Sequence, residues 1–470
     1  MNILLLNSTV PTDEVLFVRH LNCSQVSKAR AIEPPVDLII LSGILSQDGH
    51  RLHYIDGAFP TVTDEFCLSF IRSNEIDAVF LLMGEVTKNH DIGFARKIRA
   101  AFPQLVLVGL GDFVRLEPSN TLRKVPELTG LLLDFTTQNT LRFLRGERNL
   151  VNIISKEDSS ASNLLPVHEG EFKIGIPQHQ LYGSLPYRSA LAMHRKQAVT
   201  MFSFGCPYVC TFCPYEKDKY KLRDLDSARA ELRHIKASGF RDIHFMDPTF
   251  CYKRNWGLEL LDFMAKEIRL PWWCHTRADV LDATMVEAFK KAGCHTLTIG
   301  VETVTPEVSK AIKKEAKIEE IRSAFELCKK ANIRVLAHFI LGLPGETYDT
   351  NMDSINFALE TNPFYASFNI IRAMPGTALG DSYIKVHGRD EKQLQEQSYA
   401  FPEHASGQSV YDVARLRDYA NRRFYLRPSK VLEMATSVRT WYDFEKMVVN
   451  GLDIVRRYGK NSKSYEEFTY

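Results

Sequence analysis

Three cysteines stand close together in the run Gly205-Cys206-Pro207-Tyr208-Val209-Cys210-Thr211-Phe212-Cys213. Their spacing is C-x3-C-x2-C, directly after an apolar segment that reads as a strand. Cysteine thiolate is the usual ligand of a [4Fe–4S] cluster, in which each iron needs one ligand. Three local cysteines leave one iron open, and that iron can chelate the amino and carboxylate groups of a small molecule. The motif therefore predicts a catalytic iron–sulfur cluster on Cys206, Cys210 and Cys213.

Two other interpretations of the motif are a structural zinc site and a chance group of buried cysteines. A structural zinc site usually has paired ligands and closes at four, and no fourth ligand stands nearby in a matching pair. The remaining cysteines show no ligand spacing and are interpreted as core residues, with Cys251 less certain because its loop lies at the predicted active face. They are Cys23, Cys67, Cys251, Cys274, Cys294 and Cys328.

The cysteine motif resembles the signature of the radical SAM superfamily, and the resemblance extends over residues 196–375. It implies that the cluster cleaves S-adenosylmethionine (SAM) reductively to a 5′-deoxyadenosyl radical. Phe212 fills the aromatic position that lies beside the adenine in that family. The segment 299–303 resembles the family's strand-four motif, so that Glu302 is expected to contact the ribose or amino group of SAM; the alternative is a surface salt bridge.

Three further residues follow from the same resemblance. Residues 339–346 resemble in part the G-x-I-x-G-x-x-E region that supports adenine, with His338 in place of the first glycine. This resemblance implies that Gly342 contacts SAM. The alternative is that Gly342 is only a turn glycine with positive φ. Arg277 ends a predicted strand where members often place a SAM contact, although it could equally pair with Asp279. Asp247 stands where many members hold a glycine-rich amine-binding motif, and it is the expected replacement.

A series of strands and helices must position these residues. The predicted strands are Ala198–Phe204, Asp242–Met246, Trp272–Thr276, Thr296–Val301, Arg334–Leu341 and Ala366–Arg372. Asp226 and Asp282 are expected helix N-caps, and Gly239 and Gly293 are expected C-terminal stops. A complete (β/α)8 barrel needs eight units, so residues 196–388 are predicted to form a partial (β/α)6 barrel with its active site at the carboxyl ends of the strands.

The first 150 residues also alternate apolar strands with helical patterns. The predicted strands are 2–6, 51–55, 77–83, 105–108 and 130–133, and the predicted helices are 35–48, 65–73, 92–101 and one ending near residue 146. Such alternation predicts an α/β domain with a doubly wound, Rossmann-like parallel sheet. Ligands of these sheets bind beyond the carboxyl ends of the strands.

A doubly wound domain ahead of a radical SAM barrel resembles the cobalamin-binding class of that superfamily. The resemblance is carried by Pro34-Pro35, by Gly49-His50 with Asp56, and by the run Gly109-Leu110-Gly111-Asp112. It implies cobalamin binding at Pro35, Gly109 and Gly111, because glycine lets backbone approach a ligand closely.

Two departures from that class concern the lower cobalt ligand and the fifth strand. The D-x-H-x-x-G motif is absent, since His20 lacks the spacing, so cobalamin without histidine ligation is expected. The turn at 134–138 lacks the usual glycine–acid pair. The alternative is a Rossmann-like domain that has lost its ligand.

Two further segments complete the predicted organisation. Residues 151–195 are irregular and predicted to be a linker, and residues 389–470 are predicted to be a C-terminal helical region with helices at 413–425 and 430–439. The run 422–428 resembles one in the anaerobic Mg-protoporphyrin ester cyclase branch. Its aromatic and arginine residues could frame a planar or anionic substrate, but a helix end packed on the barrel is favoured.

Bulk composition restricts the class of protein. The chain has 470 residues and a formal net charge of +2, which implies no polyanion or nucleic-acid partner. No export signal or transmembrane segment is recognised, so a cytoplasmic location is expected. Nine cysteines in such a chain point to metal or thiol chemistry rather than to disulfides.

The combined resemblance implies a cobalamin-dependent radical SAM enzyme that methylates an unactivated carbon of a small-molecule substrate through methylcobalamin. Its cofactors would be a [4Fe–4S] cluster, SAM and cobalamin, and its electron donor a protein such as flavodoxin or ferredoxin. Two alternatives stay open: a radical SAM cyclase or rearrangement enzyme that transfers no methyl group, and a non-catalytic cobalamin or redox sensor.

Overall fold

The computed structural model describes residues 1–11, 16–20, 23–27, 31–158, 171–215, 219–388, 410–438 and 440–458. The chain divides into two compact units, each made of several segments. Unit 1 comprises Met1–Ser189, Arg195–Pro207 and Lys217–Met246, and unit 2 comprises Ala190–His194, Tyr208–Glu216 and Asp247–Tyr470. The predicted domain limits at residues 150, 195 and 388 stay predictions.

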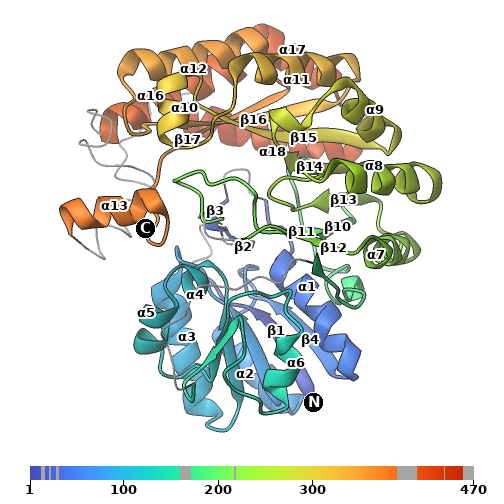
Figure 1. Ribbon diagram of the computed structural model, residues 1–470, viewed down its shortest axis with the longest axis vertical. Coiled ribbons are helices and arrows are strands. Elements are labelled where there is room, and N and C mark those ends of the chain that lie inside the picture. Colours follow the sequence, from blue (N-terminus) through green and yellow to red (C-terminus); the bar gives the residue numbers. More distant parts are fainter. Residues whose placement is uncertain are drawn as a thin grey trace. The chain divides into compact units, whose positions relative to one another are not determined.

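A six-stranded sheet forms the centre of the N-terminal part of unit 1 (Figure 1). In sheet order, its strands are β4 (Arg51–Asp56), β1 (Asn2–Asn7), β5 (Ala78–Leu82), β6 (Val106–Leu110), β7 (Gly130–Leu132) and β8 (Ile153–Ser155). The pairings are parallel from β4 to β7, and β8 is antiparallel to β7. The doubly wound sheet is confirmed, with β8 added from the segment predicted as a linker.

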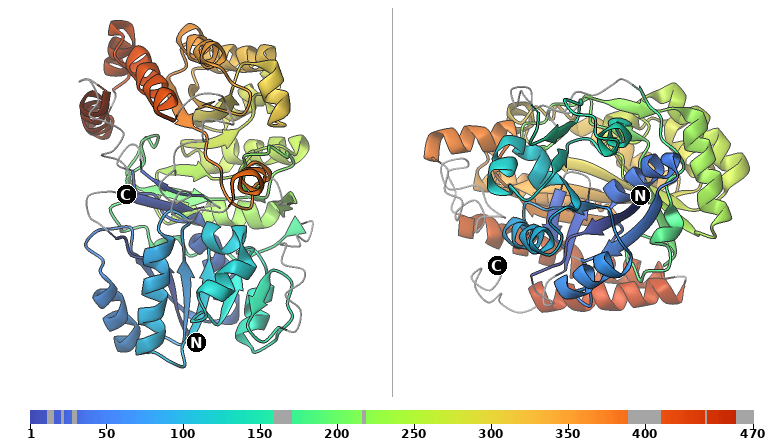
Figure 2. Two further views of the ribbon diagram at one scale, coloured as in Figure 1. Left: turned by 90° about the vertical axis from the view of Figure 1, so that its left-hand side faces the viewer. Right: turned by 90° about the horizontal axis from the view of Figure 1, so that it is seen from below.

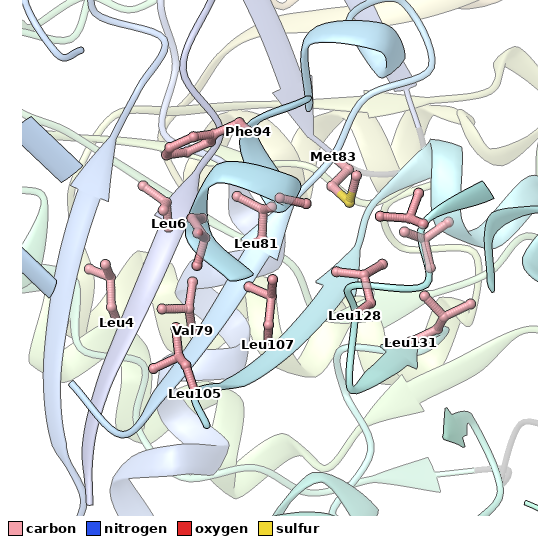
Figure 3. Close-up of a cluster of buried hydrophobic side chains, with 14 of the residues drawn as sticks. Leu4, Leu6, Val79, Leu81, Met83, Phe94, Leu105, Leu107, Leu128 and Leu131 are labelled. Atoms are coloured by element: carbon pink, nitrogen blue, oxygen red, sulfur yellow. The ribbon is translucent and has the colours of Figure 1, made fainter. Parts of the chain in front are cut away.

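Helices cover this sheet, and both of its faces are apolar. The helices are α1 (Val36–Leu45), α2 (Asp64–Ser73), α3 (Lys88–Ala101), α4 (Asp112–Leu116), α5 (Pro118–Lys124) and α6 (Asn139–Leu144). Figure 3 shows side chains of β1, β5 and β6 gathered with Phe94 of α3. Successive strand residues point to opposite faces, and both sets are buried here, as is typical of parallel sheets.

A short antiparallel hairpin follows β1, and it was not predicted from the sequence. It is formed by β2 (Phe17–His20) and β3 (Cys23–Val26). Arg19 lies buried in the hairpin and forms an ion pair with Asp91 at 3.1 Å. The Ser24 N–H and hydroxyl both donate to the Asp112 carboxylate at 2.7 Å. The hairpin is therefore tied by charge to the carboxyl end of the N-terminal sheet.

The rest of unit 1 contains the first strands of the second series. Strand β10 (Gln197–Thr200) pairs in parallel with β13 (Asp242–Phe245), and α7 (Leu225–Ala237) lies between them in sequence. The single strand predicted at 198–204 is wrong, because the segment forms two short strands, β10 and β11 (Ser203–Phe204), in different sheets. Strand β11 pairs antiparallel with β12 (Lys221–Arg223), in a small sheet that also includes β9 (Glu171–Phe172). The N-cap of α7 is Asp224, not Asp226 as predicted.

Unit 2 holds four parallel strands in sequence order. They are β14 (Trp272–Thr276), β15 (Cys294–Glu302), β16 (Arg334–Leu341) and β17 (Tyr365–Ile370). The intervening helices are α8 (Arg254–Phe263), α9 (Ala283–Lys291), α10 (Pro306–Ala311), α11 (Ile318–Lys330) and α12 (Tyr348–Thr361). Asp282 is the N-cap of α9, as predicted. With β10 and β13, six parallel strands of the second series are present.

Helices complete unit 2 after β17, and Figure 2 gives two further views of them. They are α13 (Ala378–His387), α16 (Val410–Tyr425), α17 (Pro428–Thr436) and α18 (Trp441–Tyr458), of which α18 was not predicted. The Tyr425 hydroxyl lies 2.6 Å from the carbonyl of Ala366 and 3.1 Å from its N–H, on strand β17. Phe424 is fully buried and Arg427 binds the Leu359 carbonyl. The run 422–428 thus packs as a helix end.

The predicted fold class, an N-terminal parallel sheet followed by a second series of parallel strands and C-terminal helices, is confirmed. Residues 389–409, 439 and 459–470 of the predicted helical region lie outside the described residues. None of the described helices is long and apolar enough to cross a membrane.

Gly111 generates a stability prediction. Its φ is +108°, and a Cβ there would lie 2.3 Å from the Met83 carbonyl oxygen. We expect Gly111→Ala to lower the free energy of unfolding by about 1–3 kcal/mol, because the backbone conformation is strained for any residue with a Cβ. Urea unfolding of the full chain without cofactors measures this. Gly93→Ala in α3 is the matched control: nothing lies within 4 Å of its added methyl, so it should stabilise by about 0.5–1 kcal/mol. Equal midpoints for the two variants would contradict the prediction.

Candidate active site

The loop with the three cysteines is bent by its own backbone hydrogen bonds. Cys206 follows β11 and belongs to unit 1, whereas Cys210 and Cys213 belong to unit 2. The Cys213 N–H donates to the Cys210 carbonyl at 3.0 Å, which closes a tight turn between the two. Cys210 is buried, and Cys206 and Cys213 are partly exposed.

Two distant segments hold this loop in unit 2. The Thr211 N–H donates to the Ile312 carbonyl at 3.0 Å, and the Leu379 N–H donates to the Thr211 carbonyl at 2.9 Å. Both backbone groups of Thr211, which follows Cys210, are therefore fixed, the N–H by the segment after α10 and the carbonyl by the start of α13.

The donor chemistry of the loop fits an iron–sulfur cluster, because three soft thiol ligands stand on one short segment. No group of three His, Cys, Asp or Glu side chains among the described residues is already arranged to hold a metal ion. The ligand set Cys206, Cys210 and Cys213 therefore remains a prediction, supported by the motif.

Arg277, at the end of β14, stands directly against the cysteine loop. Its guanidinium lies 3.6 Å from the ring centroid of Tyr208, and it donates to both carboxylate oxygens of Asp279, at 3.0 and 3.2 Å from Nε. The Tyr208 hydroxyl donates to the same carboxylate at 3.0 Å. The pairing of Arg277 with Asp279, which the sequence left open as an alternative, is therefore present. It leaves Nη1 of Arg277 buried with no hydrogen-bond partner.

The charges of this group are strongly coupled. Burial opposes charge on both Arg277 and Asp279, but their mutual hydrogen bonds dominate, so the pKa of Arg277 is raised and the pKa of Asp279 is lowered. The Cys210 thiol also contributes to raising the pKa of Arg277. A buried cation with one donor to spare beside Cys210, a predicted cluster ligand, suits an anionic ligand group, which supports the SAM role predicted for Arg277.

Glu302 ends strand β15 with a φ of +66°, which is unusual for a residue with a side chain. Its Oε1 lies 3.3 Å from the Nζ of Lys314, and both side chains are nearly buried. Glu302 is thus not a surface salt-bridge partner. Lys314 was missed from the sequence, because no motif marks it and only the fold brings it to β15.

Phe212, Gly342 and Glu346 come together around the end of β16. Phe212 packs against an apolar cluster that includes Ile312 and Leu343. Gly342 has a φ of +78°, and its N–H donates to the side-chain oxygen of Asn351 at 3.1 Å, so its turn role is real. The Leu343 N–H donates to Glu346 at 2.9 Å. The structure therefore gathers Phe212, Arg277, Glu302 and Gly342 in unit 2, and their contacts with SAM remain predictions.

Asp247 begins the longest segment of unit 2, two residues after the end of β13, and is buried. Burial, and then Asp247 itself, raises the pKa of the nearby Cys251 thiol well above its usual range. Cys251 has a φ of +61° and its sulfur would lie 2.8 Å from a Cβ at Gly257. A buried, unreactive thiol fits a core role for Cys251, whereas the amine-binding role of Asp247 stays a prediction.

The residues predicted to bind cobalamin lie in the N-terminal sheet region of unit 1. Pro35 precedes α1, and Gly109 and Gly111 stand at the carboxyl end of β6. A Cβ at Gly109 would lie 2.9 Å from Leu128 and 3.3 Å from Val114. The expected reason for these glycines was room for the corrin, but close approach to the protein's own core already requires them. Substitutions there cannot test cobalamin binding cleanly.

A buried polar cluster occupies the carboxyl ends of β1 and β4 in the same unit. Asp56 accepts hydrogen bonds from Asn7 at 2.7 Å, from Tyr187 at 2.5 Å and from the Ala58 N–H at 2.9 Å. Burial raises the pKa of Asp56 even though these donors act in the opposite direction. The carboxyl edge of the sheet, where open α/β sheets bind their ligands, is therefore polar at this point, and its polar groups are paired with each other.

Known proteins resemble this chain in the segment that carries the cysteine loop. A family model described as the radical SAM superfamily matches residues 200–358. An uncharacterized methyltransferase of Pyrococcus horikoshii is 25% identical over 365 residues, which cover 75% of this chain and 78% of that protein. The anaerobic magnesium-protoporphyrin IX monomethyl ester cyclase of Rubrivivax gelatinosus is 28% identical over 209 residues, and the match spans 36% of that protein.

Solved structures share the fold. A radical S-adenosylmethionine methyltransferase from Kitasatospora setae, TsrM, with cobalamin and a [4Fe–4S] cluster bound, superposes with a TM-score of 0.66 at 17% identity. That match covers 96% of this chain and 99% of TsrM. The radical SAM family model thus covers residues 200–358, and over nearly its whole length the chain has the fold of this methyltransferase.

Glu346 generates a pH prediction. Burial raises its pKa to about 7, against the lowering effect of the Leu343 N–H. A carboxyl whose pKa is raised on folding costs stability above its unfolded pKa, and the cost is complete above its folded pKa. We expect Glu346→Gln to gain stability relative to the parent as the pH rises from 4.5 to about 7, by up to about 3 kcal/mol, and to keep that gain at higher pH. Urea midpoints of the cofactor-free chain across that range measure this. The exposed Glu307→Gln should show no such trend, and a pH-independent difference for Glu346→Gln would contradict the prediction.

Proposed function

We propose that this chain is a cobalamin-dependent radical SAM methyltransferase that acts on an unactivated carbon of a small molecule. The observation that carries the proposal is a C-x3-C-x2-C loop in a radical SAM domain that follows a Rossmann-like sheet, in a chain with the fold of TsrM. Relatives whose names include methyltransferase or methylase support the reaction type, among them tryptophan 2-C-methyltransferase of Streptomyces laurentii and hopanoid C-3 methylase of Methylococcus capsulatus.

The cysteines, SAM residues and sheet edge take distinct roles in this proposal. Cys206, Cys210 and Cys213 would hold the [4Fe–4S] cluster, and the carboxyl edge of the N-terminal sheet, near Pro35, Gly109 and Gly111, would hold cobalamin. When bound, the cluster supplies the electron that cleaves SAM, and cobalamin carries the methyl group to the substrate. A protein reductant such as flavodoxin or ferredoxin would supply that electron.

The chain's own residues would bind and orient SAM beside the cysteine loop. The free Nη1 donor of Arg277 would meet the anionic carboxylate of SAM. Glu302 would accept from the ribose or amino group, Phe212 would lie beside the adenine, and the turn at Gly342 would support it. Asp247 is the further candidate for the amino group. Each of these groups is on a strand end or a loop held by several hydrogen bonds, which keeps it in place before SAM binds.

The cysteine ligands generate the first functional prediction. We expect anaerobically purified protein to contain about four irons per chain, as one [4Fe–4S] cluster requires. Replacing Cys206, Cys210 and Cys213 together by Ala should abolish both the iron and the release of 5′-deoxyadenosine from SAM with a strong reductant. Cys328→Ala removes a buried thiol of α11 and is the matched control, which should keep its iron. Iron retained by the triple variant would refute the assigned ligands.

The reaction type generates a second functional prediction. A methylating enzyme should consume two SAM molecules per turnover, one giving 5′-deoxyadenosine and one giving S-adenosylhomocysteine. The second is expected because a spent methyl carrier must be refilled by an electrophile. Mass spectrometry of reactions with cell extract, with and without added cobalamin, should show a product larger by one CH2. Substrate conversion that yields 5′-deoxyadenosine without S-adenosylhomocysteine or an added methyl would assign the chain to the cyclase or rearrangement class.

A further inference from the structure

Lys314 lies in the short connection between α10 and α11, and no sequence motif marks it. It is nearly buried, and its Nζ lies 3.3 Å from Oε1 of Glu302. A buried lysine is rare unless it is paired. Loss of one partner would leave the other as an uncompensated buried charge, which is strongly unfavourable. The pair therefore fixes where the Glu302 carboxylate can stand.

Gly300 makes the room that this ion pair needs. A Cβ at Gly300 would lie 2.3 Å from Oε1 of Glu302 and 2.9 Å from Nζ of Lys314. The φ of Gly300 is not in the left-handed region, so its glycine is explained by the pair that crosses it rather than by a turn. The pair is thus part of how strand β15 is built.

The same connection also contacts the other site elements through its backbone. The Lys314 carbonyl accepts from Nη2 of Arg277 at 3.1 Å, and two residues earlier the Ile312 carbonyl accepts from the N–H of Thr211. Lys313 and Glu315, on either side of Lys314, have φ values of +54° and +51°. Such backbone persists where the surroundings over-determine it. The connection 312–315 therefore joins the cysteine loop, Arg277 and Glu302.

We propose that Lys314 is a positioning residue of the SAM site, which orients the Glu302 carboxylate toward SAM and completes a connection that also fixes Arg277 and the cysteine loop. The proposal rests on the function proposed above and deepens it. Glu302 is the residue that would touch SAM, and Lys314 acts through it. Because the ion pair is formed from the chain's own residues, Glu302 would be in place before SAM arrives.

The test measures SAM binding rather than turnover. Equilibrium dialysis with labelled SAM gives the Kd of cluster-loaded full-length protein. We expect Lys314→Met to weaken SAM binding by roughly ten- to a hundredfold, as loss of one charge-assisted hydrogen bond implies, with iron content unchanged. Lys314→Arg keeps the charge and should recover part of the loss. Lys310→Met, an exposed lysine on α10, is the matched control and should bind like the parent.

A double-mutant comparison separates positioning from a direct contact. If Lys314 acts through Glu302, then Glu302→Gln and Lys314→Met together should weaken SAM binding no more than the stronger single change. Additive losses would mean that Lys314 acts independently, and would overturn the proposal. So would an unchanged Kd in Lys314→Met, or loss of iron in that variant alone.

A second variant covers the case in which Lys314→Met does not fold. Gly300→Ala displaces the same ion pair from the other side, and it should weaken SAM binding while iron is retained; an unchanged Kd would overturn the proposal. Failure of the parent protein to bind SAM would instead refute the proposed function. The two failures are therefore distinguishable.

Discussion

The backbone of Thr211, between two of the cysteines, is held on both sides by segments far away in the sequence. Its N–H is taken by Ile312 and its carbonyl by Leu379. A loop this short has no ladder of its own to satisfy its polar groups, so other parts of the fold must supply partners. The positions of Cys210 and Cys213 in unit 2 depend on these two bonds, and through them on the connection after α10 and the start of α13.

The charged side chains near the cysteine loop are stabilised by ion pairs. The buried Arg277 is paired with the partly exposed Asp279 and lies against the ring of Tyr208, whereas Lys314 and Glu302 are both nearly buried and are paired with each other. Glu346 has no cation beside it among the interactions that shift its pKa, and burial raises that pKa to about 7. The paired side chains stay charged, and their hydrogen bonds fix their orientation. Glu346, in the turn at the end of β16, instead changes its charge near neutral pH.

Sequence reasoning identified the architecture because buried parallel strands have a strong apolar signal, and it identified the cysteine loop because its spacing is specific. It missed what depends on tertiary contact. The strand predicted at 198–204 is mostly apolar and shows no break in sequence, yet it ends after Thr200, and its last two residues join another sheet. Lys314 carries no motif, and the reason for Gly300 exists only once Glu302 and Lys314 face it. The glycines at 109 and 111 were assigned from sequence to a corrin contact, which stays a prediction, and their neighbours in the core could not be read from one chain.

Strand β17 is the last strand of its sheet order, and such a strand normally presents unpaired N–H and carbonyl groups to its surroundings. At Ala366 the hydroxyl of Tyr425 takes up both groups at once, and α16, which carries it, runs along the strand. The side chain thereby behaves like a single residue of an additional strand. A second polypeptide could not pair with β17 at Ala366, because Tyr425 already occupies both backbone groups there. The sheet therefore does not extend beyond β17 at this point, and strand-to-strand association between copies cannot start at Ala366.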